Sequence, residues 1–421
     1  MIWRETTLGE VCDEVGGIIQ TGPFGSQLHE SDYSPDGIPV VMPKDIIEGR
    51  IATDSVARVS PEHVERLSRH KLRSGDIVYG RRGDIGRQAL IRPEQEGWMC
   101  GTGCLRLGFG EAVLNPLFLH YYLRQDDVVS WITNQAVGAT MPNLNTGILR
   151  TVPVRFPLLP VQRRIAGILS AYDELMENSQ RRIRLLETMA RALYREWFVH
   201  FRFPGHEKHP RVASPLGDIP QGWEVASIDD VCARVTDGSH HSPKSVEEGL
   251  PMASSKDMHD WGLNLDTARL ISPKDFADLV RNDCKPKKND VLITKDGANY
   301  LKYIFVARAE QEVVLLSSVA MLRPNARINP HLLAAILKEP ENKGRLRNYV
   351  TGAAIPRVVL KDFKRFELLL PSKEVQTAWA KIAEPMTEQI WRLIDQIQNL
   401  RRTRDLLLPR LLSGQVNLVT N

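Results

Sequence analysis

The chain has 421 residues, 42% of them hydrophobic and 25% charged, which is ordinary for a soluble globular protein of about two to four domains. It has no run of about 18 apolar residues and no apolar signal core, so we expect no membrane span and a cytoplasmic location. The net charge of +4 permits nucleic-acid binding without demanding it, because the distribution of charge matters more than its sum.

Residues 1–157 are expected to form a first domain of mixed character. Short β-branched and aromatic runs alternate there with Gly, Pro and Asp turns, a pattern that predicts strands and loops with a few helices. Arginine and lysine gather within it between residues 66 and 92. The chain has too few and too scattered cysteines for a disulfide framework, and the only close pair, Cys100 and Cys104, has no second pair to complete a metal cage. We therefore expect buried or free thiols.

Residues 158–203 are predicted to form a long helix, because this stretch is almost free of Gly and Pro. Its seam positions recur at alternating intervals of four and three, as in a coiled coil, and Arg, Glu, Asp and Gln fill the positions between them. The seam residues of this helix are Ile165, Leu169, Tyr172, Met176, Ile183, Leu186, Leu193 and Trp197.

After a linker at 204–221, residues 222–371 are expected to form a second mixed domain, and residues 372–421 a second long helix. Pro385 should kink the start of this helix or limit its regular part. Ser179 and Arg404 are the polar exceptions in the two seams, and we expect them to help fix the register of pairing. The apolar seam residues of the second helix are Trp379, Ile390, Leu393, Ile397, Leu400, Leu407 and Leu411.

The second half of the chain repeats the first, with a separation of 214 residues over much of its length. The matching pairs include Asp76 and Asp290, Asn115-Pro116 and Asn329-Pro330, Gln162 and Gln376, and the loops VGATMPNL at 137–144 and TGAAIPRV at 351–358. A period this long is not that of a solenoid and indicates the duplication of a whole domain.

A long helix cannot bury an apolar stripe alone, so each predicted helix needs a partner. The simplest partner is the other helix of the same chain. We therefore predict an α+β fold: two homologous globular domains separated by two long α-helices that pair as an antiparallel coiled coil, a pseudo-twofold dumbbell. The alternative is an intermolecular coiled coil with another protein. The intramolecular arrangement suits a protein that touches two sites on one DNA duplex at a fixed spacing.

Motifs of catalysis are missing from the sequence. It contains no GxxxxGK[ST] loop, no HExxH, no zinc spacing and no GxSxG, and the segment from Cys100 to Arg106 fails the GxGxxG fingerprint at its last glycine. The dipeptide His240-His241 lies in a Gly/Ser/Pro loop, where solvent-exposed histidines are more frequent than metal ligands. The sequence therefore predicts a binding module for duplex DNA, with no catalytic or metal site, whose chemistry comes from partners.

The chain resembles the specificity (S) subunit of type I restriction-modification systems along essentially its whole length. The second helix departs from the family pattern, because Thr377 and Ala378 follow Gln376 where the family usually has an Arg-Ile pair. The segments that carry the resemblance are TGPFGS at 21–26, GIP at 37–39, LLPVQRRIAGIL at 158–169, REWFV at 195–199, GWEV at 222–225, IDDVC at 228–232 and LPRLLSG at 408–414.

The resemblance implies a division of labour. The S subunit would select a bipartite DNA target, and each recognition domain would read one half-site. The paired helices would set the gap and dock two modification subunits. Those subunits would bind S-adenosylmethionine and methylate adenine, and restriction subunits would add ATP- and Mg-dependent translocation and cleavage. The alternatives are a coiled-coil adaptor that binds proteins rather than DNA, and an autonomous DNA-modifying enzyme.

Candidate DNA-reading residues lie in loops rich in Arg, Lys and Gly, because Arg and Lys suit phosphate and base-edge contacts and Gly permits close approach. The first domain offers Arg81, Arg82, Asp84 and Arg87, with a second tier of Thr21, Ser26, Gln27, Lys44, Thr140 and Asn143. The second domain offers Lys295, Asp296, Asn299 and Tyr300, with a second tier of Ser239, His240, His241, Lys256 and Arg357. The alternative for each loop is a solvated turn. We expect VGATMPNL and TGAAIPRV to be the same loop of two homologous readers.

Overall fold

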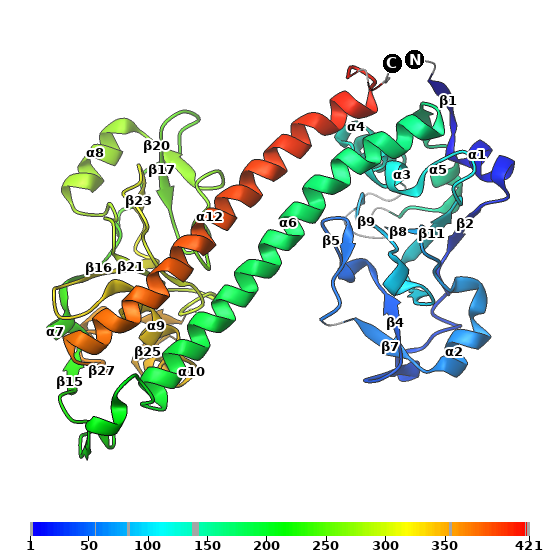
Figure 1. Cartoon of the computed structure of the whole chain (residues 1–421). Coiled ribbons are helices and arrows are strands. Elements are labelled where there is room, and N and C mark those ends of the chain that lie inside the picture. The colour runs from blue at the N-terminus through cyan, green and yellow to red at the C-terminus, as the bar shows by residue number, and fades with distance from the viewer. Residues whose placement is uncertain are drawn as a thin grey trace. The chain divides into compact units, whose positions relative to one another are not determined.

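The chain forms two compact units that share its two longest helices. The computed structural model describes residues 3–54, 56–81, 85–136, 143–352, 356–416 and 418. Unit 1 consists of Met1–Asn178 and Gln396–Asn421, and unit 2 of Ser179–Asp395. The helices α6 (Leu159–Tyr194) and α12 (Lys373–Leu412) therefore each contribute one part to each unit (Figure 1).

Unit 1 is built on a four-stranded antiparallel sheet, its main sheet, with the strand order β2-β11-β8-β9. A second four-stranded sheet has the order β10-β4-β7-β3 and contains the parallel pair β10/β4. Two-stranded sheets join β1 to β12 and β5 to β6. The strands are β1 (Arg4–Thr7), β2 (Ile18–Thr21), β3 (Tyr33–Ser34), β4 (Ile38–Val41), β5 (Ile46–Ile47), β6 (Arg50–Ile51), β7 (Ala57–Val59), β8 (Ile77–Gly80), β9 (Gln88–Leu90), β10 (Met99–Cys100), β11 (Cys104–Gly108) and β12 (Pro153–Phe156).

Unit 2 repeats this arrangement. Its main sheet has the order β16-β24-β21-β22, its second sheet the order β20-β17-β23 with a parallel pair β17/β23, and β15 pairs with β27. The α+β fold with two homologous units, predicted from the repeat, is confirmed. The strands are β13 (Arg211–Val212), β14 (Ile219–Pro220), β15 (Glu224–Ser227), β16 (Cys232–Asp237), β17 (Leu250–Ala253), β18 (Met258–His259), β19 (Gly262–Leu263), β20 (Arg269–Ile271), β21 (Val291–Thr294), β22 (Ile304–Val306), β23 (Val314–Leu315), β24 (Val319–Pro324), β25 (Val350–Thr351), β26 (Arg357–Val358) and β27 (Glu367–Leu370).

Three pairs of short helices begin alike in the two units. The first pair starts from a capping box, the second from a serine followed by proline, and the third from an asparagine followed by proline. Proline suits the first helical position, whose N–H has no partner within the helix. The pairs are α1 (Leu8–Val15) with α7 (Ile228–Val231), α2 (Pro61–Arg66) with α8 (Pro273–Arg281), and α3 (Pro116–Tyr122) with α9 (Pro330–Lys338). The other short helices are α4 (Asp126–Gln135), α5 (Thr146–Arg150), α10 (Pro340–Leu346) and α11 (Leu360–Phe363).

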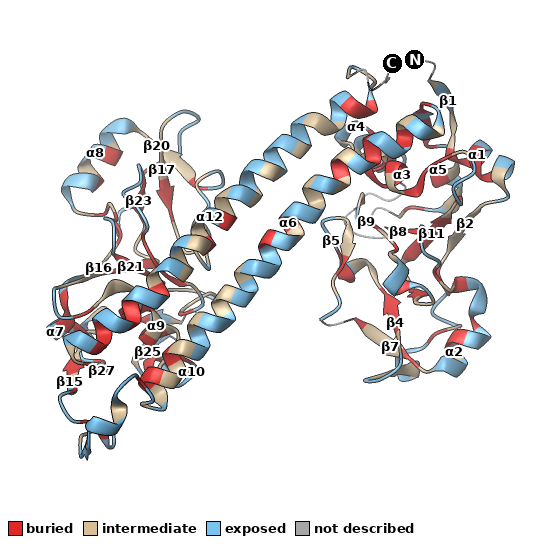
Figure 2. Cartoon of the chain, viewed as in Figure 1, coloured by how far each residue is buried: buried red, intermediate tan, exposed pale blue. Residues whose placement is uncertain are grey.

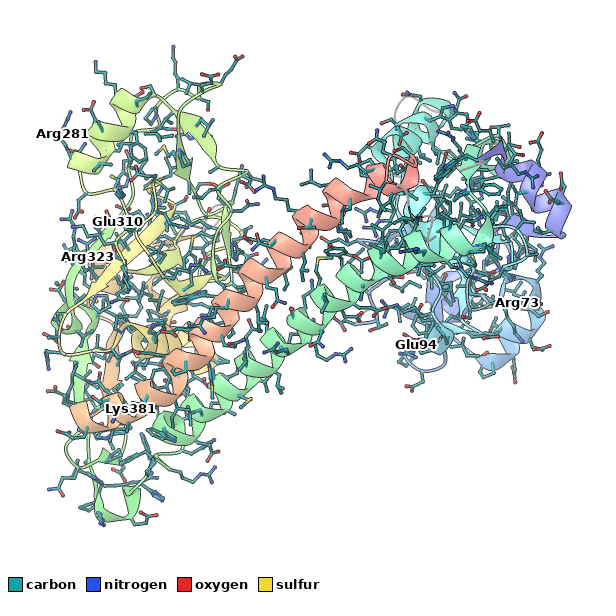
Figure 3. All side chains as sticks on the ribbon, turned by 45° about the horizontal axis from the view of Figure 1, so that its top comes forward. Arg73, Glu94, Arg281, Glu310, Arg323 and Lys381 are labelled. Carbon is teal, nitrogen blue, oxygen red and sulfur yellow. The ribbon has the colours of Figure 1, made fainter. Side chains whose placement is uncertain are left out.

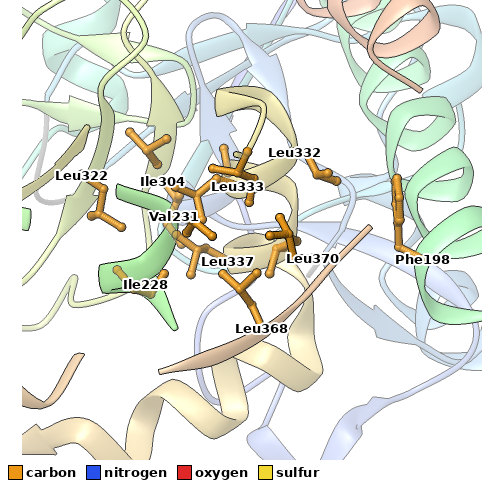
Figure 4. Packing of buried hydrophobic residues seen from close by; sticks show 14 of the residues in the cluster. Phe198, Ile228, Val231, Ile304, Leu322, Leu332, Leu333, Leu337, Leu368 and Leu370 are labelled. Atoms are coloured by element: carbon orange, nitrogen blue, oxygen red, sulfur yellow. The ribbon is translucent and has the colours of Figure 1, made fainter. Parts of the chain in front are cut away.

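Each unit has a core that joins its main sheet to the long helices. In unit 2, Leu332, Leu333 and Leu337 of α9 pack against residues of the main sheet and of β27, and Phe198 adds an aromatic ring (Figure 4). In unit 1, the equivalent cluster includes Phe118 of α3 and also side chains of both long helices. Buried positions line the inner faces of the helices, whereas their outer faces are exposed (Figure 2). The cysteines are free and buried, as expected, and burial raises the pKa of Cys100 to about 12.

Helices α6 and α12 run antiparallel within the units. In unit 1, Asp173 of α6 accepts a hydrogen bond from Arg404 of α12 at 2.5 Å, whereas Arg164, earlier in α6, reaches the carbonyl of Leu418 at 3.0 Å. No apolar seam residue is exposed. The buried ones are Ile165, Leu169, Met176, Trp197, Trp379, Ile390, Leu393 and Leu411, and the half-buried ones are Tyr172, Ile183, Leu186, Leu193, Ile397, Leu400 and Leu407.

The ends and interiors of the long helices differ from the sequence prediction in two places. Helix α12 continues through Pro385, so this residue does not limit its regular part as predicted. Helix α6 passes without a break at Tyr194 into a π-helical turn at Arg195–Val199, so the helical run ends at Val199 rather than at the predicted residue 203. That turn directs Trp197 and Phe198 into the core of unit 2, where the Phe198 ring meets Trp379 edge-on at 5.7 Å between centroids. Among the described residues, every helix is too short or too polar to traverse a lipid bilayer.

A buried glutamine joins the start of α6 to unit 1. Oε1 of Gln162 accepts from the backbone N–H of Asn115 at 2.8 Å, and Nε2 donates to the carbonyls of Val113 at 3.0 Å and Pro157 at 2.8 Å. Gln162 is 0% exposed. Oδ1 of Asn115 in turn accepts from the N–H of Phe118 and caps α3. One side chain therefore ties together three segments of the chain.

Gln376 makes the same three bonds at the start of α12. It accepts from the N–H of Asn329 at 3.0 Å and donates to the carbonyls of Arg327 at 3.0 Å and Pro371 at 2.9 Å. Positions that are far apart within each half of the repeat thus meet in one hydrogen-bonded cluster per unit. Buried backbone groups need such partners, which is the physical reason for a glutamine at both positions.

Candidate nucleic-acid interface

The main sheet of each unit gathers loops from distant parts of the sequence at one edge. In unit 1, β2 and β8 end there and β11 begins there, because β11 is antiparallel to both. In unit 2, β16 and β21 end and β24 begins at the equivalent place. We call this place the loop edge. Its described loops are residues 22–27, 42–45, 81, 85–87, 101–103 and 143–144 in unit 1, and 238–241, 254–257, 295–300, 316–318 and 356–358 in unit 2.

The backbone hydrogen bonds that hold these loops are duplicated. Three N–H groups of unit 1 and three of unit 2 donate to equivalent carbonyls. The last residue of each repeated loop, in VGATMPNL and in TGAAIPRV, therefore bonds to the residue that directly follows β8 or β21. Residues 137–142 and 353–355 of these loops lie outside the described part of the chain. The bonds run from Gly22 to Cys104 (2.9 Å), Arg81 to Gly103 (2.8 Å) and Leu144 to Arg81 (2.9 Å), and from Gly238 to Val319 (3.1 Å), Lys295 to Ser318 (2.8 Å) and Val358 to Lys295 (3.1 Å).

Basic side chains are accessible at the loop edge of unit 1. Lys44 and Arg87 are exposed, and Arg81 is half-buried. Nε of Arg81 donates to Oδ1 of Asn143 at 3.1 Å, so the structure joins two predicted residues that are distant in the sequence. Arg82, Asp84 and Thr140 lie outside the described residues.

A closed turn at residues 24–27 also belongs to the loop edge of unit 1. The N–H of Gln27 donates to the carbonyl of Phe24 at 2.8 Å, and Oε1 of Gln27 accepts from the N–H of Phe24 at 3.2 Å. The amide oxygen of Gln27 is thus used inside the turn, whereas Ser26 and Phe24 are exposed. Thr21 is half-buried at the end of β2.

The loop edge of unit 2 holds an ion-pair network. Lys295 is 3% exposed, and its Nζ lies 3.1 Å from Oδ2 of Asp237 and 3.3 Å from Oδ2 of Asp296. Nε of Arg357 lies 3.5 Å from Oδ1 of Asp296, and Nε2 of His240 lies 3.2 Å from Oδ2 of Asp237. A buried ammonium requires such partners, because an unpaired buried charge costs several kcal/mol. Lys295 therefore braces the loops of unit 2, whereas the equivalent Arg81 in unit 1 is more accessible.

The other predicted residues of unit 2 surround this network. Ser239 is buried, and its hydroxyl donates to the carbonyl of His241 at 2.8 Å. His241 and Lys256 are exposed, whereas Asn299 and Tyr300 are half-buried. His240 and His241 belong to no cluster of three potential metal ligands among the described residues.

Lys44 and Lys256 lie in the same kind of turn in the two units. In unit 1 the N–H of Met42 donates to Oδ2 of Asp45 at 2.9 Å, and in unit 2 the N–H of Ser254 donates to the equivalent Asp257 at 2.8 Å. The aspartate closes the turn, and both lysines project from it into solvent. The repeat therefore presents one exposed ammonium at each loop edge, in the same setting.

The basic residues between 66 and 92 do not form one patch. Among those described, Arg81 and Arg87 belong to the loop edge and Arg66 reaches it through the carbonyl of Gln27, while Arg73 is exposed in the loop before β8 (Figure 3). Lys71 pairs with Glu65 at 2.6 Å, and Arg92 pairs with Glu177 of α6 at 3.3 Å. Sequence clustering alone therefore overstates the positive charge of the loop edge.

The end of each main sheet opposite the loop edge is held by an aspartate and an arginine. Nε of Arg106 lies 2.6 Å from Oδ2 of Asp76, and Nε of Arg323 lies 2.8 Å from Oδ1 of Asp290. Burial raises the pKa of the Asp76 carboxyl, and the nearby Arg73 N–H and Arg106 only partly offset this. The hydrogen bond from Asp290 raises the pKa of Arg323. These pairs fix the sheets on which the loops stand.

Asp237 stands at the loop edge of unit 2 but is absent from the sequence prediction, and Phe24 lies within the predicted stretch from Thr21 to Gln27 without being singled out there. Asp237 is the first partner of Lys295, and Phe24 is 54% exposed. The signal that points to both is a glycine, Gly22 or Gly238, directly after the first strand of each main sheet. These glycines are 216 rather than 214 residues apart, so a fixed offset does not align them.

Known proteins resemble this chain along nearly all of its length. A family model described as "Type I restriction modification DNA specificity domain" matches residues 3–188 and again residues 220–400. The type I restriction enzyme MjaIX specificity subunit of Methanocaldococcus jannaschii is 23% identical, over 98% of this chain and 96% of that protein. The HindI specificity subunit of Haemophilus influenzae is 21% identical, over 98% and 99%.

A solved structure shares the fold. The crystal structure of the type I restriction-modification system S subunit from M. genitalium superposes with a TM-score of 0.59 and 17% sequence identity, and the match covers 98% of this chain and 96% of that one. The two matches to the family model fall on the two halves of the duplication.

Proposed function

Because the chain belongs to the family of type I restriction-modification DNA specificity domains, we propose that it is the subunit that selects the DNA sequence in such a system. Each unit reads one half of a bipartite duplex target. The paired helices set the spacing between the half-sites and dock two modification subunits.

The observation that carries this proposal is the duplicated loop edge. The same backbone framework presents Lys44, Arg81 and Arg87 in one unit and Lys256, Arg357 and His240 in the other. Basic groups position a protein on phosphates, and varied side chains at equivalent positions specify different bases. Two readers of different half-sites require this combination of a common framework and divergent tips.

The long helices support the proposed spacing role, because α6 and α12 each belong in part to both units. A helix rises about 1.5 Å per residue, so inserting residues in both helices lengthens the connection by a known amount. The exposed outer faces of the helices are available to the modification subunits.

Catalysis in this proposal belongs to the partners. The modification subunits bind S-adenosylmethionine and methylate adenine, and restriction subunits bind ATP and Mg²⁺ for translocation and cleavage. The chain itself supplies the choice of sequence and the assembly surface, and it works in the cytoplasm, where the DNA is.

Mapping adenine methylation tests the proposal. Cells that express the modification subunits are sequenced with and without this chain, and methylation is expected at a two-part motif only when the chain is present. Exchanging residues 1–157 for those of a related subunit is expected to change one half of the motif. A motif that stays the same, or changes in both halves, contradicts the assignment of one half-site to each unit.

Salt dependence distinguishes DNA binding from the adaptor alternative. Binding to duplex DNA releases counterions, so the logarithm of affinity should fall linearly with the logarithm of salt concentration. A chain that binds only proteins shows no affinity for duplex DNA at any salt concentration.

A further inference from the structure

Two exposed aromatic rings stand at the same position of the two loop edges. Phe24 is 54% exposed, and the side chain of His240 is 69% exposed. The sequence shows neither as a repeat, because the pair is 216 residues apart and the residues differ. The strand registers establish the equivalence.

The strand registers of the two main sheets show that Phe24 and His240 occupy equivalent positions. Thr21 pairs with Leu105, which pairs with Tyr79 on β8. In unit 2, Asp237 pairs with Ala320, which pairs with Ile293, the repeat equivalent of Tyr79 on β21. Thr21 and Asp237 are therefore equivalent, and each ring follows three residues later.

A glycine brings each ring to the loop edge. At Gly22, a Cβ atom would lie 2.1 Å from the carbonyl oxygen of Gly101, and at Gly238 it would lie 2.2 Å from that of Leu315. Neither position therefore accepts a side chain, and the backbone passes directly against the neighbouring loop. The hydrogen bond from the N–H of Gly22 to Cys104 of β11, or from that of Gly238 to Val319 of β24, then fixes the direction in which the chain leaves the sheet.

The turns that carry the rings are held by their own polar groups. The turn of Phe24 is closed by Gln27, and Arg66 donates to the carbonyl of Gln27 at 2.9 Å. His240 is held by Asp237, which also binds the buried Lys295. The turns therefore hold both rings at fixed places while the rings are exposed to water, and burial of exposed ring surface against a ligand is favourable.

DNA bases supply the surface that such rings bind. Aromatic side chains contact the thymine methyl group, stack on unstacked bases or wedge between base steps, whereas phosphates offer nothing to an apolar ring. The same loop edges also carry an exposed lysine each, Lys44 in unit 1 and Lys256 in unit 2, and lysines suit phosphates.

We propose that Phe24 and His240 are base-contacting rings, one for each half-site. This inference rests on the proposed function and adds two specificity-determining residues to it. Phe24 has no hydrogen-bonding group in its side chain, so its half-site is read at that position by shape and apolar contact. His240 adds ring nitrogens and so reads its half-site differently from an equivalent place.

Selection from a random duplex pool tests the proposal with the full chain. Bound duplexes are sequenced for the wild type and for the variants Phe24→Ala and His240→Ala. Phe24→Ala is expected to lower the affinity for the selected duplex about tenfold and to relax one position of one half-site. His240→Ala is expected to relax a position of the other half-site only.

A matched control is Ile47→Ala, because Ile47 is also 54% exposed. It lies on the β5–β6 hairpin, where Arg50 pairs with Glu177 of α6, and outside the segments that form the loop edge. The Ile47→Ala variant is expected to select the same sequence as the wild type and to bind it with an affinity within about twofold. Thermal unfolding of all three variants should match the wild type, since the replaced side chains are exposed.

Modified probes separate the two kinds of base contact. If Phe24 touches a thymine methyl group, deoxyuridine in place of that thymine reproduces the loss in the wild type, and Phe24→Leu keeps most of the affinity. If the ring unstacks a base, 2-aminopurine at the neighbouring position brightens in the wild-type complex and not in that of Phe24→Ala.

Two results overturn the proposal. One is a wild type that selects a bipartite duplex while Phe24→Ala and His240→Ala select the same duplex with affinities within about twofold. The other is a loss that is uniform across all sequences. Both leave the proposed function standing. A wild type that prefers no duplex sequence contradicts the proposed function itself, and with it this inference.

Discussion

Replacement of the buried glutamine at the start of α6 is a direct test of how each unit is attached to the long helices. Gln162→Leu removes three hydrogen bonds and leaves the N–H of Asn115 and the carbonyls of Val113 and Pro157 without partners. Each unsatisfied buried group costs about 1–3 kcal/mol, and the burial of the leucine side chain offsets part of the sum. We expect a loss of about 3–5 kcal/mol in the free energy of unfolding, and a similar loss for Gln376→Leu.

Urea unfolding followed by circular dichroism measures the total, and hydrogen exchange locates it. The amide of Asn115 should exchange faster in Gln162→Leu, and that of Asn329 in Gln376→Leu. The matched control is Gln180→Leu, because Gln180 is an exposed glutamine on the same helix. The reasoning fails if Gln162→Leu costs less than about 1 kcal/mol, or no more than the control.

Gln162→Glu tests the same three hydrogen bonds through the pH dependence of stability. One carboxylate oxygen still accepts from Asn115, but the other now faces two carbonyls in place of a donor. The pKa of the new carboxyl is therefore expected to rise in the folded state above its unfolded value of about 4.3. The variant should be least stable relative to the wild type above that raised pKa, and the difference should shrink as the pH falls through it. A difference that does not vary with pH contradicts this arrangement.

Three further expectations concern charged side chains. Burial tends to raise the pKa of the Asp173 carboxyl, but hydrogen bonds from Tyr121 and Arg404 together hold this pKa below its usual value. The carboxylate therefore stabilises the fold above about pH 4, and this stabilisation is lost as the pH falls through the lowered pKa. Arg404→Leu should cost about 3 kcal/mol of unfolding free energy at neutral pH and weaken this acid dependence, which urea unfolding at several pH values measures. Lys295→Met leaves Asp237 and its neighbouring carboxylate without their cation and should lower the melting temperature by several degrees, whereas an unchanged melting temperature would mean that the ammonium does not brace the loops. Lys44→Ala should weaken DNA binding similarly for all sequences and reduce the slope of log affinity against log salt by about one, and a sequence-dependent loss would instead make it a base contact.

The sequence by itself determined the duplication, the two long helices and their seams. These features are local or periodic. A heptad pattern shows which face of a helix is apolar, and a sequence repeat predicts that two segments have the same fold. Asn115-Pro116 and Asn329-Pro330 were recognisable as equivalent for the same reason, and capping explains why each starts a helix. The scarcity of Gly and Pro marked the long helices; Pro385 was expected to kink one of them or limit its regular part, and that helix continues through it.

Only the tertiary structure decided which residues meet. The pairing of Arg81 with Asn143 depends on where β2, β8 and β11 place their loops, and the burial of Lys295 between two carboxylates depends on β16, β21 and β24 in the same way; a linear pattern does not contain that information. The sequence treated Arg81 and Lys295 as equal candidates because their positions match. The fold separates them, since desolvation and the neighbouring acidic groups turn Lys295 into an internal brace and leave Arg81 more accessible. The equivalence of Phe24 and His240 also depends on strand register, because hydrogen-bond pairing aligns residues that a fixed offset in the sequence does not.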